Sequence, residues 1–118
     1  MIFIYIDRFM TFLSAFLKCE LINASYFKYT LPIKNYYLIQ WVPGSRTTIH
    51  NHNGKQCDFM LLNGSLTECR YVGENIGSLI EVNKIKPFQI SSINDEIGHH
   101  QMFNFDDEVR WSIHKYYK

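Results

Sequence analysis

Residues 44–64 of the chain read GSRTTIHNHNGKQCDFMLLNG, and this stretch decides the fold that the rest of the sequence completes. On an extended strand, residues two apart point to the same face, so His50 and His52 can converge on one ion. Neutral imidazoles suit zinc, copper, iron and nickel. Without further context, a His-x-His sequence is about as often an ordinary pair on a solvated strand face as it is part of a metal site. Here Gly44 before the pair and Asn63-Gly64 after it, a sequence typical of a type I′ hairpin, indicate tight β-structure around the histidines.

A second pair of histidines lies nearer the carboxyl end of the chain. Residues 92–104 read SINDEIGHHQMFN, which predicts a turn, a loop and then a strand. Adjacent strand residues face opposite sides, so only one of His99 and His100 can point at an ion held by His50 and His52. The spacing alone does not choose between them.

A third pattern of polar residues lies close to the end of the chain. Ser112, His114 and Tyr116 alternate with other residues, so they share one face of an expected strand. An ordinary amphipathic strand has the same spacing, and by itself this pattern does not indicate a site.

The rest of the chain reads as a series of short strands separated by turn residues, with one helix before the first strand. Strands are expected at about residues 36–42, 49–52, 57–62, 65–72, 79–82, 87–93, 100–105 and 109–117. Such a series favours an all-β barrel or jelly roll over about residues 35–117. Apolar residues at helical spacing predict a helix over about residues 8–22, and the stripe expected to pack on the barrel is Phe9, Phe12, Leu13, Phe16, Leu17 and Leu21. Residues 26–34, broken by Pro32, are expected to be irregular.

The composition describes a single small globular domain covering residues 1–118. Apolar residues make up 47% and aromatic residues 16%, which is enough for a packed interior. The net charge is +1 without a basic run, which argues against nucleic acid as a partner. Asp7 and Arg8 interrupt the apolar N-terminus, so neither a signal peptide nor a membrane span is expected. The odd cysteine count fits a reducing cytoplasm, and we expect a monomer there.

Taken together and in order, these segments resemble the cupin superfamily and, within it, the thiol dioxygenases, cysteine dioxygenase in particular. Gly44, His50, His52 and Gly64 fall at the spacings of the first cupin motif, and His100 with Asn104 falls at those of the second. The other resembling pieces are Trp41-x-Pro-Gly, Cys57 five residues after His52, Gly64-Ser-Leu-x-Glu, Ile93-Asn-Asp-x-Ile-Gly-x-His and Ser112-x-His-x-Tyr. The resemblance implies a small cupin, a jelly-roll β-barrel, with the N-terminal helix packed on its outside.

The resemblance also implies a site and a reaction. It selects His100 rather than His99, so that His50, His52 and His100 hold Fe(II); Cys57 replaces the usual glutamate of the first motif. A small thiol substrate would bind the iron as thiolate beside O2, and both oxygen atoms would pass to sulfur, giving a sulfinate. Tyr116 would lie near the substrate or oxygen, oriented by His114 and then Ser112. Cys57 matches a cysteine that some family members link to this tyrosine as a thioether; a small buried thiol is the equal alternative.

One feature of cysteine dioxygenases is missing from the sequence. An arginine that follows a Tyr-Thr pair grips the substrate carboxylate in that family, but here Tyr29-Thr30 is followed by Leu31. Arg110 shares the strand face of Ser112 and is a candidate substitute, although a surface charge at the start of the strand is the more common explanation. Lys34 and Arg70 are weaker candidates, and Glu68 with Arg70 is expected on a solvated strand face.

Three functions therefore remain open. The intact histidine set and the Ser-x-His-x-Tyr strand favour a thiol dioxygenase acting on cysteine or a related mercapto acid. The same three histidines with zinc, nickel or manganese would serve hydrolysis or isomerisation in another cupin. The absent arginine keeps open a non-catalytic cupin that binds a metal or a small ligand.

Overall fold

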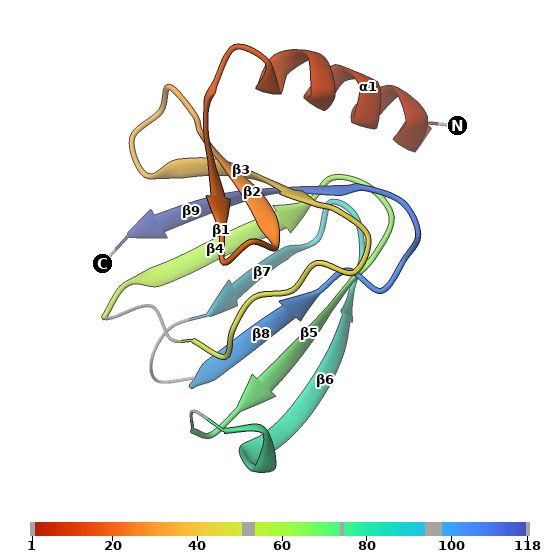
Figure 1. Cartoon of the computed structure of the whole chain (residues 1–118). Helices are drawn as coiled ribbons and strands as arrows, with labels where there is room; N and C mark the ends of the chain where they lie inside the picture. The colour runs from red at the N-terminus through yellow and green to blue at the C-terminus, as the bar shows by residue number, and fades with distance from the viewer. Residues whose placement is uncertain (1, 51–53, 74, 94–97, 118) are drawn as a thin grey trace.

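The computed structural model describes residues 2–50, 54–73, 75–93 and 98–117. Within these ranges the chain forms one helix, nine strands and one short 3-10 turn (Figure 1). Their bounds are α1 (Ile2–Ser14), β1 (Lys18–Ile22), β2 (Tyr26–Thr30), β3 (Tyr36–Trp41), β4 (Gln56–Leu61), β5 (Leu66–Tyr71), η1 (Ile76–Ser78), β6 (Leu79–Ile85), β7 (Ile90–Ile93), β8 (His99–Phe103) and β9 (Arg110–Tyr117). The expectation of an all-β fold with one helix is confirmed.

The strands form two antiparallel sheets. The larger sheet has the order β1-β2-β3-β9-β4-β7, and the smaller has the order β6-β5-β8. Residues 46–50 extend the smaller sheet, because isolated antiparallel bridges join Arg46 to Phe103 and His50 to His100. This segment places His50 beside β8.

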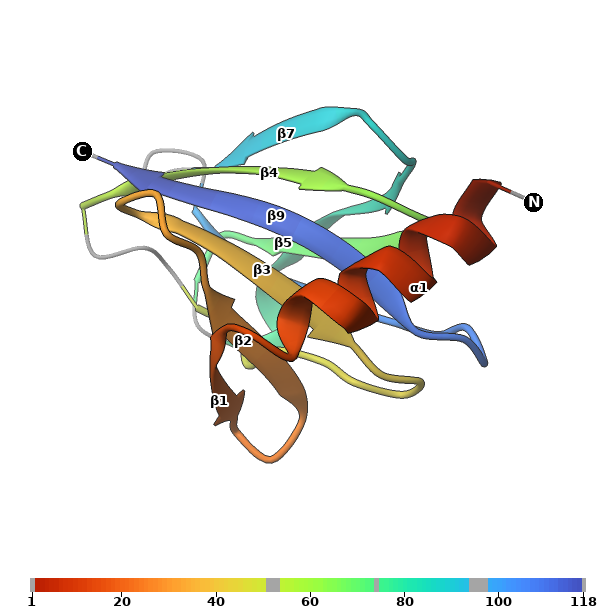
Figure 2. The ribbon, with the colours of Figure 1, turned by 90° about the horizontal axis from the view of Figure 1, so that it is seen from above.

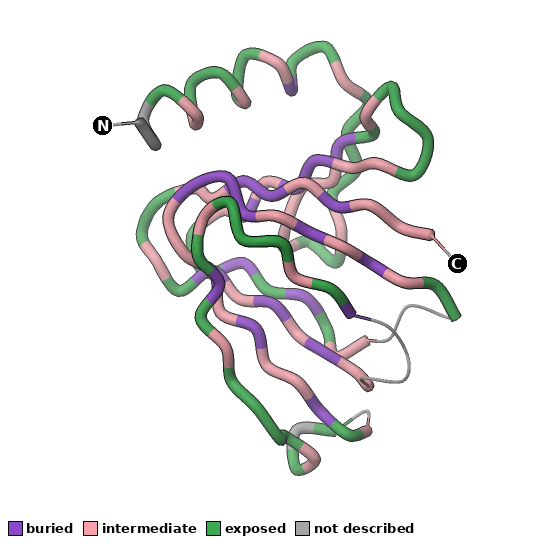
Figure 3. Tube along the Cα trace, turned by 180° about the vertical axis from the view of Figure 1, so that it is seen from behind, coloured by how far each residue is buried: buried purple, intermediate pink, exposed green. Residues whose placement is uncertain are grey.

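The two sheets enclose the main core. Alternate residues of β4 are buried, as expected for a strand with one face inward. The buried cluster takes residues from both sheets, namely Ile39, Trp41, Cys57, Phe59, Leu61, Leu66, Ile85, Ile93 and Met102. Figure 3 shows the buried stretches on the strands of both sheets.

Asn63-Gly64 does not make the type I′ hairpin that its sequence predicts. That turn needs positive φ at both central residues, but only Gly64, with φ of 68°, has one. β4 lies in the larger sheet and β5 in the smaller, so the turn is a corner between sheets. The buried Asn63 side chain stabilises this corner, since it accepts a hydrogen bond from Trp111 N at 2.7 Å and donates one to Val109 O at 3.1 Å.

The N-terminal segment differs from its sequence prediction. The helix begins at Ile2 and ends at Ser14, and two strands, β1 and β2, occupy residues assigned to helix or irregular structure. The apolar spacing of the helix runs on into β1, where pairing with β2 overrides it. Asn23 and Ala24, with φ of 50° and 51°, form the turn between these strands. In the described part of the chain no helix is long and apolar enough to cross a membrane.

α1 packs on the outer face of the larger sheet through other residues than most of those expected. Ile6 and Met10 of α1 contact a second buried cluster, made of Tyr29, Leu38, Leu62 and Trp111. Leu17, which belongs to the expected stripe, contacts the same cluster from beyond the end of the helix. By contrast, the expected core residues Phe9, Phe12 and Phe16 are 57%, 65% and 73% exposed. Figure 2 shows the helix lying across β9 and β3.

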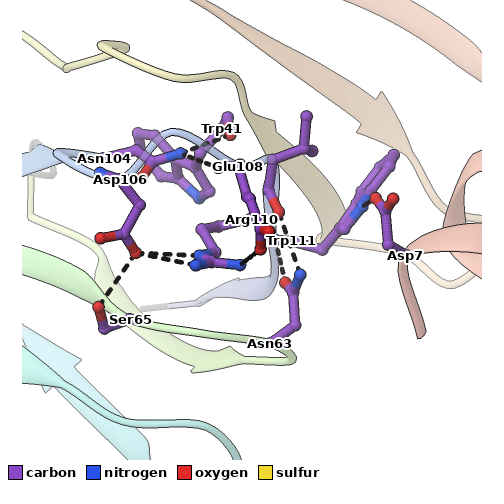
Figure 4. A network of polar contacts seen from close by, with 10 residues as sticks. Asp7, Trp41, Asn63, Ser65, Asn104, Asp106, Glu108, Arg110 and Trp111 are labelled. Atoms are coloured by element: carbon purple, nitrogen blue, oxygen red, sulfur yellow. Dashed lines mark hydrogen bonds and ion pairs between the residues drawn. The ribbon is translucent and has the colours of Figure 1, made fainter. Parts of the chain in front are cut away.

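A polar network fixes the start of β9 to its surroundings (Figure 4). The Arg110 guanidinium donates to Asp106 Oδ2 at 3.0 Å and to Glu108 Oε2 at 3.3 Å. Trp111 Nε1 donates to Asp7 Oδ1 at 2.7 Å, which ties α1 to the sheet. A Cβ added at Gly64 would overlap the guanidinium group of Arg110. The arginine therefore packs directly on the corner between the sheets.

This packing predicts unequal costs for two glycine substitutions. Gly64→Ala and Gly44→Ala both place alanine at positive φ, which costs about 1–2 kcal/mol. A Cβ at Gly44 meets nothing within 4 Å, whereas one at Gly64 displaces Arg110 from Asp106. We expect Gly64→Ala to lower the free energy of unfolding in urea by at least about 1 kcal/mol more than Gly44→Ala. Equal losses would show that Arg110 does not constrain the corner.

Candidate metal centre

A narrow cavity lies between the sheets and collects most of the candidate residues. Its volume is about 20 Å³, room for about one water-sized group. The larger sheet lines it with Tyr26, Ile39, Trp41, Cys57, His114 and Tyr116. The opposite wall consists of Thr47, His50, His100 and Met102.

His50 and His100 are brought together by backbone pairing. His50 N donates to His100 O at 3.0 Å, and His100 N donates to His50 O at 2.9 Å. Residues that exchange both hydrogen bonds lie directly opposite one another, with their side chains on the same face. As a result the two imidazole Nε2 atoms are 3.0 Å apart.

The partners of the other ring nitrogens determine what these two Nε2 atoms can do. His50 Nδ1 lies 2.8 Å from the carbonyl oxygen of Thr48, and His100 Nδ1 lies 3.0 Å from Glu68 Oε2. Both partners accept hydrogen bonds, so each Nδ1 carries the proton and each Nε2 of a neutral ring presents a lone pair. Two facing lone pairs at this distance repel one another unless a proton or a metal ion lies between them. The pair therefore fits a metal ion with nitrogen ligands at about 2.0–2.1 Å.

Protonation of His50 is unfavourable in this setting. Burial, and then the neighbouring His100, lower the pKa of His50 to about 4. His50 is thus neutral near pH 7, which is the form that binds metals.

Glu68 accepts a hydrogen bond from His100 on the side away from His50, a role not predicted from the sequence. It was expected on a solvated face, but its exposed fraction is 1%. Its carboxylate accepts hydrogen bonds from Arg70 Nε at 2.9 Å and Asn83 Nδ2 at 3.3 Å, besides His100. Burial raises the pKa of Glu68, but the hydrogen bonds from His100 and Arg70 outweigh burial and hold that pKa below its usual range. A buried carboxylate that orients a histidine is a frequent companion of metal ligands.

The opposite wall contains the polar strand face of β9. Trp41 Nε1 donates to Ser112 Oγ at 2.8 Å, and Ser112 Oγ lies 2.7 Å from His114 Nε2. Ser112 Oγ thus joins Trp41 to the imidazole of His114. The other nitrogen of His114, Nδ1, lies 3.8 Å from Cys57 Sγ.

Cys57 and Tyr116 are direct cross-strand partners on β4 and β9. Burial raises the pKa of Cys57 to about 12, and burial, followed by the adjacent Cys57, raises that of Tyr116. Both groups therefore stay protonated near neutral pH. The rings of His114 and Tyr116 stack at an angle of 21°, with centroids 6.4 Å apart.

The predicted site residues are distributed as follows. His50, His100, Cys57, His114 and Tyr116 line the cavity, and Ser112 lies behind His114. His52 lies outside the described residues, and within the described ranges no third metal-binding side chain joins the pair. Arg110 requires a correction, because Asp106 and Glu108 hold its guanidinium and it is not among the lining residues.

The fold also shows where the side chain at position 31 lies, the position at which the sequence lacks the expected arginine. Leu31 packs against the second buried cluster, beneath α1. It therefore lies on the side of the larger sheet away from the cavity, so the side chain at position 31 does not serve the site.

Solved structures share this fold at low sequence identity. The structure of Drosophila melanogaster CENP-C bound to CAL1 has a TM-score of 0.70 and 12% identity, covering 93% of this chain and 94% of the other. A cupin sugar phosphate isomerase from Silicibacter pomeroyi has a TM-score of 0.68 and 13% identity, covering 88% and 73% of the two chains. These similarities establish the cupin fold.

Oxalate oxidase in complex with glycolate matches with a TM-score of 0.58 and 15% identity over 70% of this chain. The match spans only 41% of the oxalate oxidase chain. The sequence itself matches the family of cysteine dioxygenase type I over residues 31–118, which is most of its length. This cupin-type chain therefore belongs to the cysteine dioxygenase type I family.

Proposed function

We propose that the protein is a non-haem Fe(II) thiol dioxygenase that converts a small thiol and O2 into a sulfinic acid. The observation that carries this proposal is the pair of imidazole Nε2 atoms, 3.0 Å apart, at a narrow cavity that Cys57 and Tyr116 also line. Family membership supports the choice of thiol oxidation among cupin reactions.

In this proposal His50, His100 and His52 hold the iron, with His52 assigned from its motif alone. Bound Fe(II) supplies positions for a thiolate and for dioxygen. Three neutral imidazoles leave the charge of the ion uncompensated, which favours an anionic sulfur ligand. Glu68 holds the ring of His100 in the tautomer that presents Nε2.

The wall opposite the histidines handles protons and orientation. Tyr116 stays protonated because its pKa is raised, so its hydroxyl can donate a hydrogen bond to a bound oxygen or substrate atom. The hydrogen bonds from Trp41 through Ser112 to His114 fix the imidazole beside it. Ser112 and His114 are buried, and the low local dielectric strengthens these polar contacts.

The proposal includes a thioether between Cys57 and Tyr116, which are register partners. A bond between Sγ and a ring carbon ortho to the hydroxyl would form, with loss of two hydrogens and transfer of two electrons to O2. Such a link would hold the phenol rigidly beside the histidines. The structure leaves Cys19, Cys57 and Cys69 without disulfides, and we place the protein in the reducing cytoplasm.

A second candidate is a non-catalytic cupin that binds another protein. Three exposed aromatic residues favour it, Phe9 and Phe12 of α1 and Phe16 just after the helix, because such side chains are enriched at protein interfaces. The CENP-C structure, which matches over nearly its whole length, contains a bound partner, CAL1. Catalysis separates the two candidates.

The first prediction tests catalysis directly. Iron-loaded protein, offered cysteine, 3-mercaptopropionate and cysteamine separately, should consume O2 with at least one of them. The product should be the sulfinate, identified by a mass gain of two oxygen atoms. Apoprotein treated identically serves as the control. Iron-bound protein that consumes no oxygen with any thiol would favour the non-catalytic candidate.

The second prediction concerns Glu68. Glu68→Gln removes the anion that orients His100, and loss of such a partner typically weakens metal binding about 10–100-fold. The matched control is Glu81→Gln, an exposed glutamate on the neighbouring strand β6, which should bind metal like the unmodified protein. Competition with a chelator of known affinity measures both. Equal affinity in the two variants would remove Glu68 from the site.

The third prediction concerns the thioether. Protein produced with iron and oxygen should be about 2 Da lighter than its sequence mass, by the loss of two hydrogens. After denaturation and alkylation only Cys19 and Cys69 should be labelled. Tyr116→Phe lacks the phenol that activates the ring and should restore labelling of Cys57. Full alkylation of three cysteines in active protein would contradict the link.

A further inference from the structure

The outer side of α1 carries a row of exposed aromatic side chains. Tyr5, Phe9, Phe12 and Phe16 are all more than half exposed, and they follow one another at intervals of four, three and four residues. Residues at this spacing lie along one side of a helix. Phe16 stays in line, because its N–H donates to Leu13 O at 3.1 Å and its ring meets that of Phe12 edge to face, with centroids 5.3 Å apart. We call these four residues the aromatic stripe.

The aromatic stripe is not the side of α1 that packs on the sheet. Ile6 and Met10 contact the second buried cluster, and Ser14 is buried. At 3.6 residues per turn, these three residues lie about a third of a turn away from the stripe. In the described part of the chain no element covers the stripe, and Figure 1 shows α1 as the outermost element on its side of the molecule. A surface helix of a single domain normally has one apolar side, so a second one indicates a partner.

The exposed area of the stripe is sufficient for an interface. With about 200 Å² for each fully exposed aromatic side chain, the stripe leaves roughly 500 Å² of mostly apolar surface in contact with water. Two copies that cover one another's stripes would therefore bury about 1,000 Å² before any flanking residue is included, which reaches the lower limit for a specific protein interface.

The order of the stripe reads the same in both directions along the helix. A twofold axis midway between Phe9 and Phe12 would place Phe9 of one copy against Phe12 of an antiparallel second copy, and Tyr5 against Phe16. Alternating intervals of three and four residues are those of a coiled-coil seam, in which side chains of two helices interdigitate. Twofold symmetry is also the commonest symmetry of soluble oligomers. A second copy of α1 thus offers a surface that is complementary to the stripe.

The charge of α1 does not suit a membrane surface. Helices that lie on anionic membranes are rich in lysine and arginine on their polar side. α1 has one basic residue, Arg8, and one acidic residue, Asp7, which accepts a hydrogen bond from Trp111. The helix therefore has no excess of positive charge that would attract anionic lipid.

We infer that α1 is the interface of a symmetric dimer, in which the aromatic stripes of two copies of this chain pack against each other in antiparallel orientation. The dimer differs from the monomer expected from the sequence, a prediction that goes with Phe9, Phe12 and Phe16 in the interior. The inference goes beyond the proposed function and does not depend on it, because α1 packs outside the larger sheet and the metal cavity lies between the sheets.

Sedimentation velocity over a series of protein concentrations measures the dimer. Phe9→Glu and Phe12→Glu each place a charge in the middle of the stripe, at helix positions that accept glutamate. The matched control is Phe105→Glu, an exposed phenylalanine outside α1. Thermal melting followed by circular dichroism shows that each variant is folded. We expect the unmodified protein and Phe105→Glu to be dimers, and each stripe variant to raise the dimer Kd by about thirtyfold or more.

Disulfide cross-linking tests the antiparallel order of the two helices. Phe9→Cys and Phe12→Cys chains, each also carrying Cys19→Ser to remove the exposed native thiol, are mixed and oxidised with diamide. The antiparallel pairing predicts that the cross-linked species joins one Phe9→Cys chain to one Phe12→Cys chain. Predominant cross-linking of each chain to itself would contradict this pairing.

Three other results would overturn the dimer. The first is an unmodified protein that stays monomeric at every attainable concentration. The second is a dimer that both stripe variants leave intact, which would place the interface elsewhere. The third is a monomer that floats with vesicles of phosphatidylcholine and phosphatidylserine and loses this binding in Phe9→Glu and Phe12→Glu, which would assign the stripe to a membrane surface.

Discussion

The site depends on one close contact, the 3.0 Å approach of two imidazole lone pairs between His50 and His100. The contact follows from backbone pairing, since residues 46–50 run beside β8 and the two histidines exchange both hydrogen bonds. Each ring is then fixed by an acceptor at its far nitrogen, Thr48 O or Glu68. The protein thus positions two electron pairs with rigid elements and leaves their repulsion to be relieved by a cation.

This arrangement places buried charge in an apolar core. Glu68, on β5 of the smaller sheet, is almost fully buried. Burying a carboxylate is unfavourable unless its hydrogen bonds are complete. His100, Arg70 and Asn83 supply those bonds. The second buried cluster, under α1, lies on the other face of the larger sheet and does not include the polar residues of the site. The fold therefore has apolar packing that stabilises it independently of the histidines.

Local sequence patterns correctly predicted those strands whose residues alternate between a buried and an exposed face. Alternation placed His114 and Tyr116 together on β9 and identified most strands, and the cupin motif selected His100. Long-range pairing decided what the sequence could not show. β1 is a strand because β2 pairs with it, despite apolar spacing that suits a helix. Asn63 forms the corner between the sheets because the backbone of Trp111, far along the chain, donates a hydrogen bond to its side chain. Glu68 is buried because β5 lies between β6 and β8. β2 follows β1 directly in the chain, but Trp111 and β8 lie far from Asn63 and Glu68, outside any short window of sequence.

The register of β2 explains why a leucine is tolerated where the family has an arginine. Thr30 pairs with Tyr37, and the chain turns at once, so Leu31 packs in the cluster beneath α1. An arginine there would be directed into apolar packing on the wrong side of the sheet, at a high desolvation cost. The same register turns Lys28 to the inner face, against Tyr37 and Tyr116. The alignment of β2 therefore places position 31 away from the cavity and position 28 on the inner face of the sheet.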